Sequence, residues 1–380
     1  MLDVIVIGAG PAGCVAARDI ARAGARVAIV DGSHPREKPC GGGVTGRALE
    51  FAGASAANVR GYTVRRVVFE AGRRAVTIGI DAVQTLRIFN REAFDAALLH
   101  EATAAGAVHR PARASQLKRT GDGWEVATAY ERLRASWLIG ADGVCGITRR
   151  VVAQPFERSD LSIATGSFVD GTTADEVVVG FTDDPRGYLW SFPRPDRLAV
   201  GACSQADTTT PAALHAVTDR WLEGYAPAAG WARRRYSWPI PSPAAERIGR
   251  QPTSGDRWLL LGDAAGLVDP ITREGIYFAL ASGAAAAAAL AGVDPERAYD
   301  RRIRDQVHPE LRRAARLKDA FFRPRFTRLL IDALESSAAI RGVMVDLIAG
   351  RQPYDTLKRR LLGTLEFGLM ARIVCRRGAS

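Results

Sequence analysis

The sequence has 380 residues, of which 47% are hydrophobic and 24% charged, so it can bury a sizeable core in one large or two closely joined domains. The five cysteines are scattered and form no C-x-x-C pair, which disfavours a disulfide framework and a metal site and fits a reducing cytoplasm. The net charge is +11, and residues 301–380 carry most of it, with 18 Lys and Arg against 8 Asp and Glu. No uncharged run is long enough to predict a membrane-spanning helix.

The N-terminal segment predicts a βαβ unit. An apolar stretch precedes a glycine turn, an alanine-rich helix and a second apolar stretch that ends at Asp31. Gly8 permits the turn, Gly10 lets the backbone approach a pyrophosphate, and Gly13 allows the helix to pack closely on the strand. Asp31 is placed to accept hydrogen bonds from a ribose. The predicted dinucleotide-binding residues are Gly8, Gly10, Ala12, Gly13, Asp31 and Gly32.

Three later segments predict the rest of the cofactor site. Residues 90–102 are typical of a helix, residues 137–150 of a strand followed by a turn, and residues 257–292 of a strand followed by a long helix of small residues. The start of that last helix has unpaired N–H groups, and its dipole favours negative charge beside it. These segments contribute Arg91, Asp142, Gly143, Gly262, Asp263, Pro270, Gly275 and Ile276 as candidate cofactor-binding residues.

Taken together and in this order, the four segments resemble the fingerprints of FAD enzymes of the p-hydroxybenzoate hydroxylase class. By that resemblance Asp263 would bind the flavin ribityl chain and Arg91 would lie near the pyrophosphate. Asp142 would belong to the motif that serves both FAD and the nicotinamide donor. The sequence has one G-x-G-x-x-G motif, so NAD(P)H or another external electron donor would dock transiently.

Within that class, the stretches "KPCGGG", "YLWSFP" and "GDAAGLVDPITREGI" resemble the geranylgeranyl reductase family, flavoenzymes that saturate prenyl double bonds. Cys203 and Arg273 depart from its pattern, since each stands where glycine is common. The resemblance implies an α/β fold with a discontinuous Rossmann-type FAD-binding domain (residues 1–154 and 251–295). A β-rich substrate domain would occupy residues 155–250, and a basic helical C-terminal region residues 296–380.

Cys40 and the three glycines after it form the predicted catalytic loop. Gly41, Gly42 and Gly43 would let this loop pass close over the flavin ring, because only glycine tolerates the required φ angles and contact distance. Gly43 is assigned to cofactor binding, and Cys40, Gly41 and Gly42 to catalysis. Cys40 could shape the pocket, donate a proton or hold the substrate. A loop with an inert thiol is the alternative.

Tyr188, Trp190 and Phe192 alternate along one predicted strand. A period of two directs all three rings to the same face, where they could line an apolar substrate pocket. Packing within the core of a sheet produces the same pattern. The family resemblance favours the pocket.

The basic C-terminal helices, expected near residues 296–320 and 326–349, could close over the pocket as a lid or lie on a membrane surface. The lid is favoured. The sequence thus predicts a cytoplasmic FAD-dependent reductase of prenyl or related apolar lipids, with peripheral contact at the inner membrane face as an option. The alternatives are a flavin-dependent monooxygenase, as a hydroxylase rather than a halogenase, and a non-catalytic flavin-containing membrane or nucleic-acid binding module. No motif supports a nucleic-acid partner.

Overall fold

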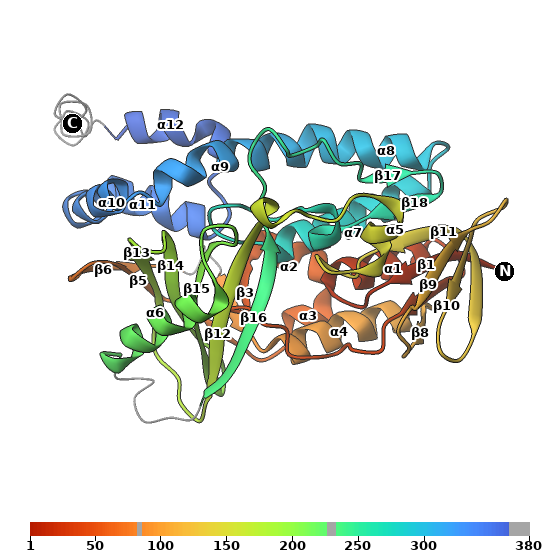
Figure 1. Ribbon diagram of the computed structural model, residues 1–380, viewed down its shortest axis with the longest axis horizontal. Helices are drawn as coiled ribbons and strands as arrows, with labels where there is room; N and C mark the ends of the chain where they lie inside the picture. The colour runs from red at the N-terminus through yellow and green to blue at the C-terminus, as the bar shows by residue number, and fades with distance from the viewer. Residues whose placement is uncertain (82–85, 226–232, 365–380) are drawn as a thin grey trace.

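The computed structural model describes residues 1–81, 86–225 and 233–364. Cys375 and the end of the predicted C-terminal region, residues 365–380, lie outside the described residues. A mostly parallel sheet occupies one end of the molecule and a large, mostly antiparallel sheet the other, with a row of helices along one side of both (Figure 1). This arrangement confirms the predicted α/β class, with a Rossmann-type part, a β-rich part and C-terminal helices.

The eight-stranded sheet contains the predicted βαβ unit. Strand β1 (Leu2–Ile7) pairs in parallel with β2 (Val27–Val30) and β11 (Arg132–Gly140), and helix α1 (Pro11–Arg22) connects β1 to β2. Because the parallel strands β1, β11 and β18 run in one direction, the turns that follow them meet at one edge of the sheet. The other strands of this sheet are β8 (Val108–Arg110), β9 (Gln116–Arg119), β10 (Trp124–Ala127), β17 (Ser254–Gly255) and β18 (Trp258–Leu260).

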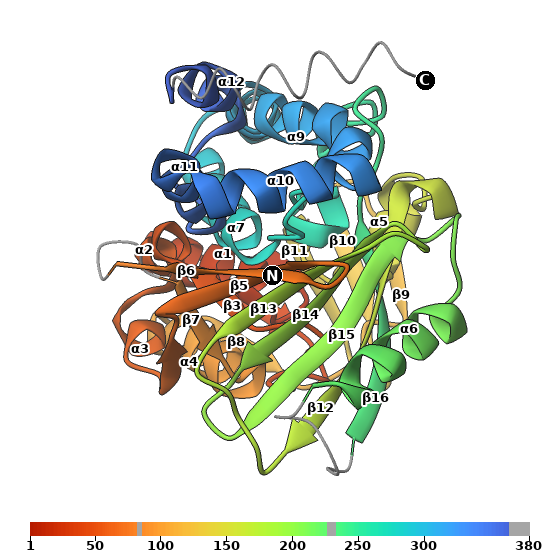
Figure 2. The ribbon, with the colours of Figure 1, turned by 90° about the vertical axis from the view of Figure 1, so that its left-hand side faces the viewer.

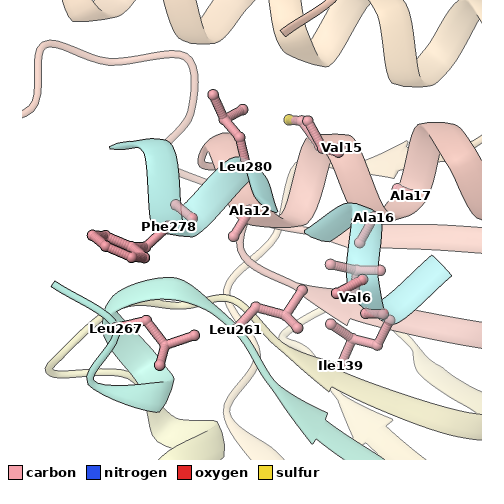
Figure 3. Close-up of a cluster of buried hydrophobic side chains, with 14 of the residues drawn as sticks. Val6, Ala12, Val15, Ala16, Ala17, Ile139, Leu261, Leu267, Phe278 and Leu280 are labelled. Carbon is pink, nitrogen blue, oxygen red and sulfur yellow. The ribbon is translucent and has the colours of Figure 1, made fainter. Parts of the chain in front are cut away.

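Helix α7 (Ile276–Leu290) packs closely on α1. A Cβ added at Gly283 of α7 would lie 2.5 Å from the carbonyl oxygen of Ala12, and one added at Gly13 would lie 2.0 Å from that of Gly8. Side chains larger than hydrogen are excluded at both positions. Figure 3 shows Leu280 of α7 beside Val15 of α1, within the core that these helices share with the parallel sheet.

The seven-stranded sheet has β12 (Leu161–Asp170) as its second strand from one edge. Strand β5 (Arg66–Ala71) pairs in parallel with β13 (Val177–Thr182). The seven-stranded sheet therefore includes strands from residues 1–154 as well as from residues 155–250. Helix α6 (Pro211–Glu223) packs on β12 and β15. The remaining strands are β6 (Arg74–Gly79), β14 (Gly187–Pro193), β15 (Arg197–Gln205) and β16 (Arg233–Pro241), and the order across the sheet is β16-β12-β15-β14-β13-β5-β6.

A small third sheet follows the Cys40 loop. Its strand β3 (Gly43–Thr45) begins at the last glycine of that loop and pairs with β7 (Leu86–Phe89), which leads into helix α4 (Arg91–Ala104). The loop is therefore anchored at its C-terminal end by β-sheet hydrogen bonds. Strand β4 (Gly61–Thr63) pairs with the other side of β7 and completes this sheet. The other elements before the C-terminal helices are α2 (Gly46–Ala52), α3 (Ala54–Ala57), α5 (Ile147–Val152) and the 3-10 turns Arg158–Asp160 and Gly262–Ala265.

The C-terminal helices cover the space between the sheets. Figure 2 shows α10 crossing over the seven-stranded sheet, where it contacts β5, β6 and β13. The helix predicted near residues 326–349 is two helices, because Ser337 has extended backbone and its hydroxyl accepts a hydrogen bond from the Ile340 N–H (3.2 Å), which caps α11. Within the described ranges, no helix combines the length and apolar character needed to cross a bilayer. The helices are α8 (Pro295–Arg302), a π-turn (Ile303–Val307), α9 (His308–Phe321), α10 (Pro324–Ser336), α11 (Ala338–Ile348) and α12 (Tyr354–Leu362).

Candidate functional site

A cavity of about 270 Å³ lies between the glycine loops, the seven-stranded sheet and the C-terminal helices. Its wall is mostly apolar and aromatic. The predicted residues that line it are Cys40, Gly41, Gly42, Gly43, Arg91, Tyr188, Trp190, Phe192, Asp263, Gly275 and Ile276. Those that do not are Gly8, Gly10, Ala12, Gly13, Asp31, Gly32, Asp142, Gly143, Gly262 and Pro270. The structure thus brings the Cys40 loop, the start of α7 and the aromatic row to one cavity.

The glycine turn after β1 has the geometry of a phosphate-binding turn. Gly8 has a φ of 104°, and a Cβ added there would lie 2.4 Å from the carbonyl oxygen of Ala141. Gly10 is the N-cap residue of α1, so no side chain caps this helix. The nearest atom to a Cβ added at Gly10 is His34 Nε2, at 3.8 Å. With no side-chain cap, the first-turn N–H groups of α1 are of the kind that bind a phosphate.

Asp31 holds the loop after β2 against this turn. Its Oδ2 atom accepts hydrogen bonds from the Ala9 N–H (2.8 Å) and from His34 Nδ1 (2.8 Å), and its Oδ1 atom accepts one from the Ser33 N–H (2.6 Å). Burial raises the pKa of Asp31, but the hydrogen bonds from His34 and Ala9 outweigh it and hold the pKa below its ordinary range. The carboxylate stays ionised, next to Gly32. Its contact with a ribose stays a prediction.

Asp142 lies at the end of β11, beside the glycine turn. Its Oδ2 atom accepts hydrogen bonds from the N–H (2.9 Å) and the hydroxyl (3.1 Å) of Thr148. Its Oδ1 atom is buried and has no hydrogen-bond partner among the described residues, and burial raises the pKa of Asp142. The turn continues through Gly143, which has a φ of 78°. A donor from a bound ligand or a water would satisfy this oxygen.

Asp263 lies where the loop after β18 meets the start of α7. Its Oδ2 atom accepts a hydrogen bond from Lys38 Nζ (3.0 Å), which links this loop to the Cys40 loop. The preceding Gly262 has a φ of 52°. Gly275 caps α7 without a side chain and, with Ile276, lines the cavity. The positive end of the α7 dipole is therefore at the cavity wall.

Two buried arginines hold Cys40 at the cavity. Arg91 donates to Cys40 Sγ (3.4 Å) and makes a two-bond ion pair with Asp95 (2.9 and 2.8 Å). Arg194, which directly follows β14, donates to the Cys40 carbonyl oxygen (2.6 Å) and pairs with Glu37. The position of the thiol is thus fixed from both the Rossmann-type part and the seven-stranded sheet. Arg91 was predicted near a pyrophosphate, and its contacts here are with Asp95 and Cys40.

At two of the three loop glycines, contacts within the protein explain why a larger residue would not fit, without any bound ligand. A Cβ added at Gly41 would lie 2.2 Å from Phe192 Cδ2. Gly42 has a φ of 83°, and a Cβ there would lie 2.3 Å from the carbonyl oxygen of Phe89. The glycines therefore let the loop pack against the aromatic row and β7. Close approach to the flavin ring stays a prediction.

Two further glycines leave room for aromatic rings of the seven-stranded sheet, Trp190 of the aromatic row and Tyr236 of β16. A Cβ added at Gly201 would lie 2.5 Å from Trp190 Cζ2, and one added at Gly166 would lie 2.5 Å from Tyr236 Cζ. Tyr188 stacks on Phe322 of the helical layer, with ring centroids 6.1 Å apart. The wall of the cavity is therefore shared between strand β14 and the turn after α9.

The two departures from the reductase pattern lie together. Arg273 has a φ of 59°, the left-handed conformation that glycine adopts more easily, and its guanidinium donates to Ser242 Oγ (2.7 Å) and to the carbonyl oxygen of Pro270. Lys318 of α9 donates to the same hydroxyl (3.3 Å). Burial and nearby Arg273 lower the pKa of Lys318 to about 8. Cys203 is buried opposite Tyr188 in the sheet.

Sequence reasoning missed several wall residues. Trp238 and Ile240 alternate along β16 as the aromatic row does along β14, so the same period of two could have identified them. The only feature of the sequence that could have identified Arg194 is its position directly after "YLWSFP". The C-terminal helices were predicted to close over the pocket, but no signal identified which of their side chains would line it, because that depends on how the helices pack. The missed residues include Lys38, Trp238, Ile240, Phe321, Phe322, Met344 and Leu347.

A family model described as an FAD binding domain matches residues 1–320. The chain belongs to this family. It is 28% identical over 354 residues to a digeranylgeranylglycerophospholipid reductase of Methanothrix thermoacetophila, covering 84% of this chain and 88% of the relative. It is 27% identical over 386 residues to a menaquinone reductase of Mycobacterium tuberculosis, covering 91% and 90%. The predicted resemblance to geranylgeranyl reductases is confirmed.

Solved structures show the same fold. A geranylgeranyl bacteriochlorophyll reductase-like protein from Thermoplasma acidophilum superposes with a TM-score of 0.80 at 22% identity, covering 96% of this chain and 99% of that one. The flavin-dependent brominase Bmp2 gives a TM-score of 0.74 at 20% identity, covering 97% and 99%. Reductases and halogenating enzymes thus share this architecture, and the fold alone does not choose between them.

The residues of the site fit FAD. The start of α1 has no side-chain cap, Asp142 has a buried oxygen without a partner among the described residues, and Asp263 and the start of α7 lie at the cavity. These features suit, in order, a pyrophosphate, a hydroxyl donor and a polar ring edge. The protein is an FAD-dependent oxidoreductase.

Proposed function

We propose that the protein saturates carbon–carbon double bonds of a prenyl, geranylgeranyl-type lipid or a related apolar substrate. The observation that carries this proposal is the cavity in which an apolar and aromatic wall adjoins the Cys40 loop and the start of α7. A cavity of this kind suits a hydrocarbon chain, because most of its wall surface is apolar. The relatives named as reductases of prenylated lipids and of menaquinone support the same substrate class.

In the proposed reaction the alkene π bond breaks and two C–H bonds form, one from a hydride that FAD supplies when bound and reduced, and one from a proton. NAD(P)H or another external donor restores the reduced cofactor. The aromatic wall excludes water and orients the chain. The residues proposed to hold FAD are Gly8, Gly10, Ala12, Gly13, Asp31, Gly32, Gly43, Arg91, Asp142, Gly143, Gly262, Asp263, Pro270, Gly275 and Ile276.

Cys40 is the proton donor in this proposal. It lines the cavity, and the Arg91 guanidinium beside its sulfur would stabilise the thiolate that remains after transfer. Glu274 also lines the cavity, but its carboxylate is held by Thr45 (2.7 Å) and by an ion pair with Arg47. An isolated alkene has no carbonyl to accept developing charge, so a positioned acid matters for this chemistry.

The test is anaerobic mixing of the reduced holoprotein with a geranylgeranyl lipid while the absorbance of oxidised flavin is followed. Reoxidation without oxygen supports alkene reduction. Cys40→Ser should slow reoxidation while FAD content stays unchanged, because Cys40 is assigned to proton transfer and not to cofactor binding. If reoxidation waits for air with these lipids, a flavin-dependent hydroxylase replaces the reductase as the proposed function.

A further inference from the structure

A continuous aromatic path leads from the cavity to the protein surface. Tyr188 stacks on Phe322, Phe322 contacts Phe321 with ring centroids 5.2 Å apart, and Phe321 contacts Phe326 at 5.5 Å. Phe321 and Phe322 line the cavity, whereas Phe326 in the first turn of α10 is 40% exposed. The α9–α10 turn, residues 321–328, is thus both cavity wall and outer surface.

This turn is strongly basic. Residues 321–328 contain three arginines and no acidic residue. Arg323 and Arg325 are exposed and make no ion pair with any described residue, while exposed Arg328 reaches Asp183 at 3.6 Å. Leu317, one helical turn before Phe321 on α9, is 42% exposed. Exposed apolar side chains thus stand beside cations that the protein leaves unneutralised.

Aromatic and aliphatic side chains interspersed with arginines match the boundary between lipid headgroups and acyl chains. The rings can enter the apolar layer while guanidinium groups remain at the phosphates. An acidic protein would satisfy the charges but would not explain why the apolar path continues inward to a cavity suited to a hydrocarbon chain.

We propose that the α9–α10 turn is a membrane-docking surface, where Phe326 enters an anionic bilayer, Arg323 and Arg325 contact lipid phosphates, and the substrate passes along Phe321 and Phe322 into the cavity. The substrate route rests on the proposed function, whereas the docking surface does not. The predicted membrane contact of the C-terminal helices is thereby assigned to this one turn. The lid and membrane roles are then compatible, because the helices that cover the cavity also carry the membrane-docking surface.

The test is co-sedimentation of the FAD-loaded protein with vesicles of phosphatidylcholine, with and without phosphatidylglycerol. Arg323→Gln/Arg325→Gln should weaken binding to the anionic vesicles about 25-fold, from about fivefold per arginine, and leave the weak binding to neutral vesicles unchanged. Phe326→Ser should weaken binding about tenfold to the anionic vesicles. Thermal unfolding checks that both variants are folded.

Tyr130 provides the matched control. It is 85% exposed in the turn between β10 and β11, at the opposite end of the molecule from α10 (Figure 1). Tyr130→Ser removes as large an exposed ring and should leave vesicle binding unchanged. Absence of binding to anionic vesicles, or binding by folded Phe326→Ser and Arg323→Gln/Arg325→Gln variants equal to that of the unmodified protein, overturns the docking surface.

Rates of lipid reduction distinguish a failure of the docking surface from a failure of the proposed function. For Phe326→Ser, the rate with vesicle-embedded lipid should fall relative to the rate with the same lipid in detergent. Equal loss in both presentations contradicts the substrate route. If no lipid is reduced in either presentation while the vesicle-binding pattern holds, the proposed function fails and the docking surface stands.

Discussion

The buried ion pair between Arg91 and Asp95 gives a sharp test of how the site is built. Asp95 is 0% exposed and Arg91 2%, and their side chains join through two hydrogen bonds of 2.9 and 2.8 Å. Asp95→Ala would leave the Arg91 guanidinium buried beside Cys40 without its counter-charge. Breaking such a pair costs about 3–5 kcal/mol. At about 2–4 °C per kcal/mol, the melting temperature should fall by roughly 6–20 °C.

The assay is thermal unfolding in the presence of excess FAD, so that loss of cofactor does not dominate the result. Asp300 and Arg304 form a control pair of the same residue types and the same i, i+4 spacing, with exposed side chains (3.2 Å, 42% and 55% exposed). Asp300→Ala should cost less than about 1 kcal/mol.

The double variant Arg91→Leu/Asp95→Leu tests the cause. Because it removes both charges, it should recover much of the stability that Asp95→Ala loses. A loss in Asp95→Ala no larger than in Asp300→Ala would refute the reasoning. So would a double variant that is less stable than Asp95→Ala.

Three further predictions concern packing, titration and thiol access. Gly41→Ala should lower the free energy of unfolding by about 1–3 kcal/mol, because its Cβ meets the Phe192 ring, whereas Gly79→Ala, with open space around it, should stay within about 0.5 kcal/mol; urea unfolding compares them. The pKa of Lys318 falls from 10.5 to about 8 through burial and Arg273, so the unfolded chain binds more protons between these pH values, and the free energy of unfolding should rise with pH across this range by up to about 3 kcal/mol. Lys318→Met should abolish most of that rise, and an unchanged pH profile would contradict it. In a Cys375→Ser background, a thiol reagent should modify exposed Cys145 and half-buried Cys40 in the folded protein, and buried Cys14 and Cys203 only on unfolding; Cys145→Ser should remove one of the two reactions of the folded protein.

The parts of the fold that depend on local chemistry were predictable from the sequence. The glycine turn and the βαβ unit follow from residues close together in the chain, and the close approaches at Gly8 and Gly13 bear out their steric reasons. Alternation along residues 188–192 placed three rings on one face, and all three line the cavity. The i, i+4 spacing of Arg91 and Asp95 was visible as well, although their complete burial was not.

Long-range pairing was not predictable in the same way. Periodicity can indicate that residues 66–71 form a strand, but it does not reveal β13 as the partner. The reasons for Gly41 and Gly42 depend on Phe192 and Phe89, which only the folded chain brings near. Phe321 and Phe322 likewise join the cavity through helix packing. A single sequence carries no direct record of these contacts.

The most direct test of the central claim is the product mass after one anaerobic turnover of the reduced holoprotein with a geranylgeranyl lipid. Alkene reduction should give a product heavier by two hydrogens, formed without oxygen and in proportion to the reduced flavin consumed. A lipid of unchanged mass under these conditions, together with an oxygen-containing product formed from it only after air is admitted, would contradict alkene reduction and identify a hydroxylase.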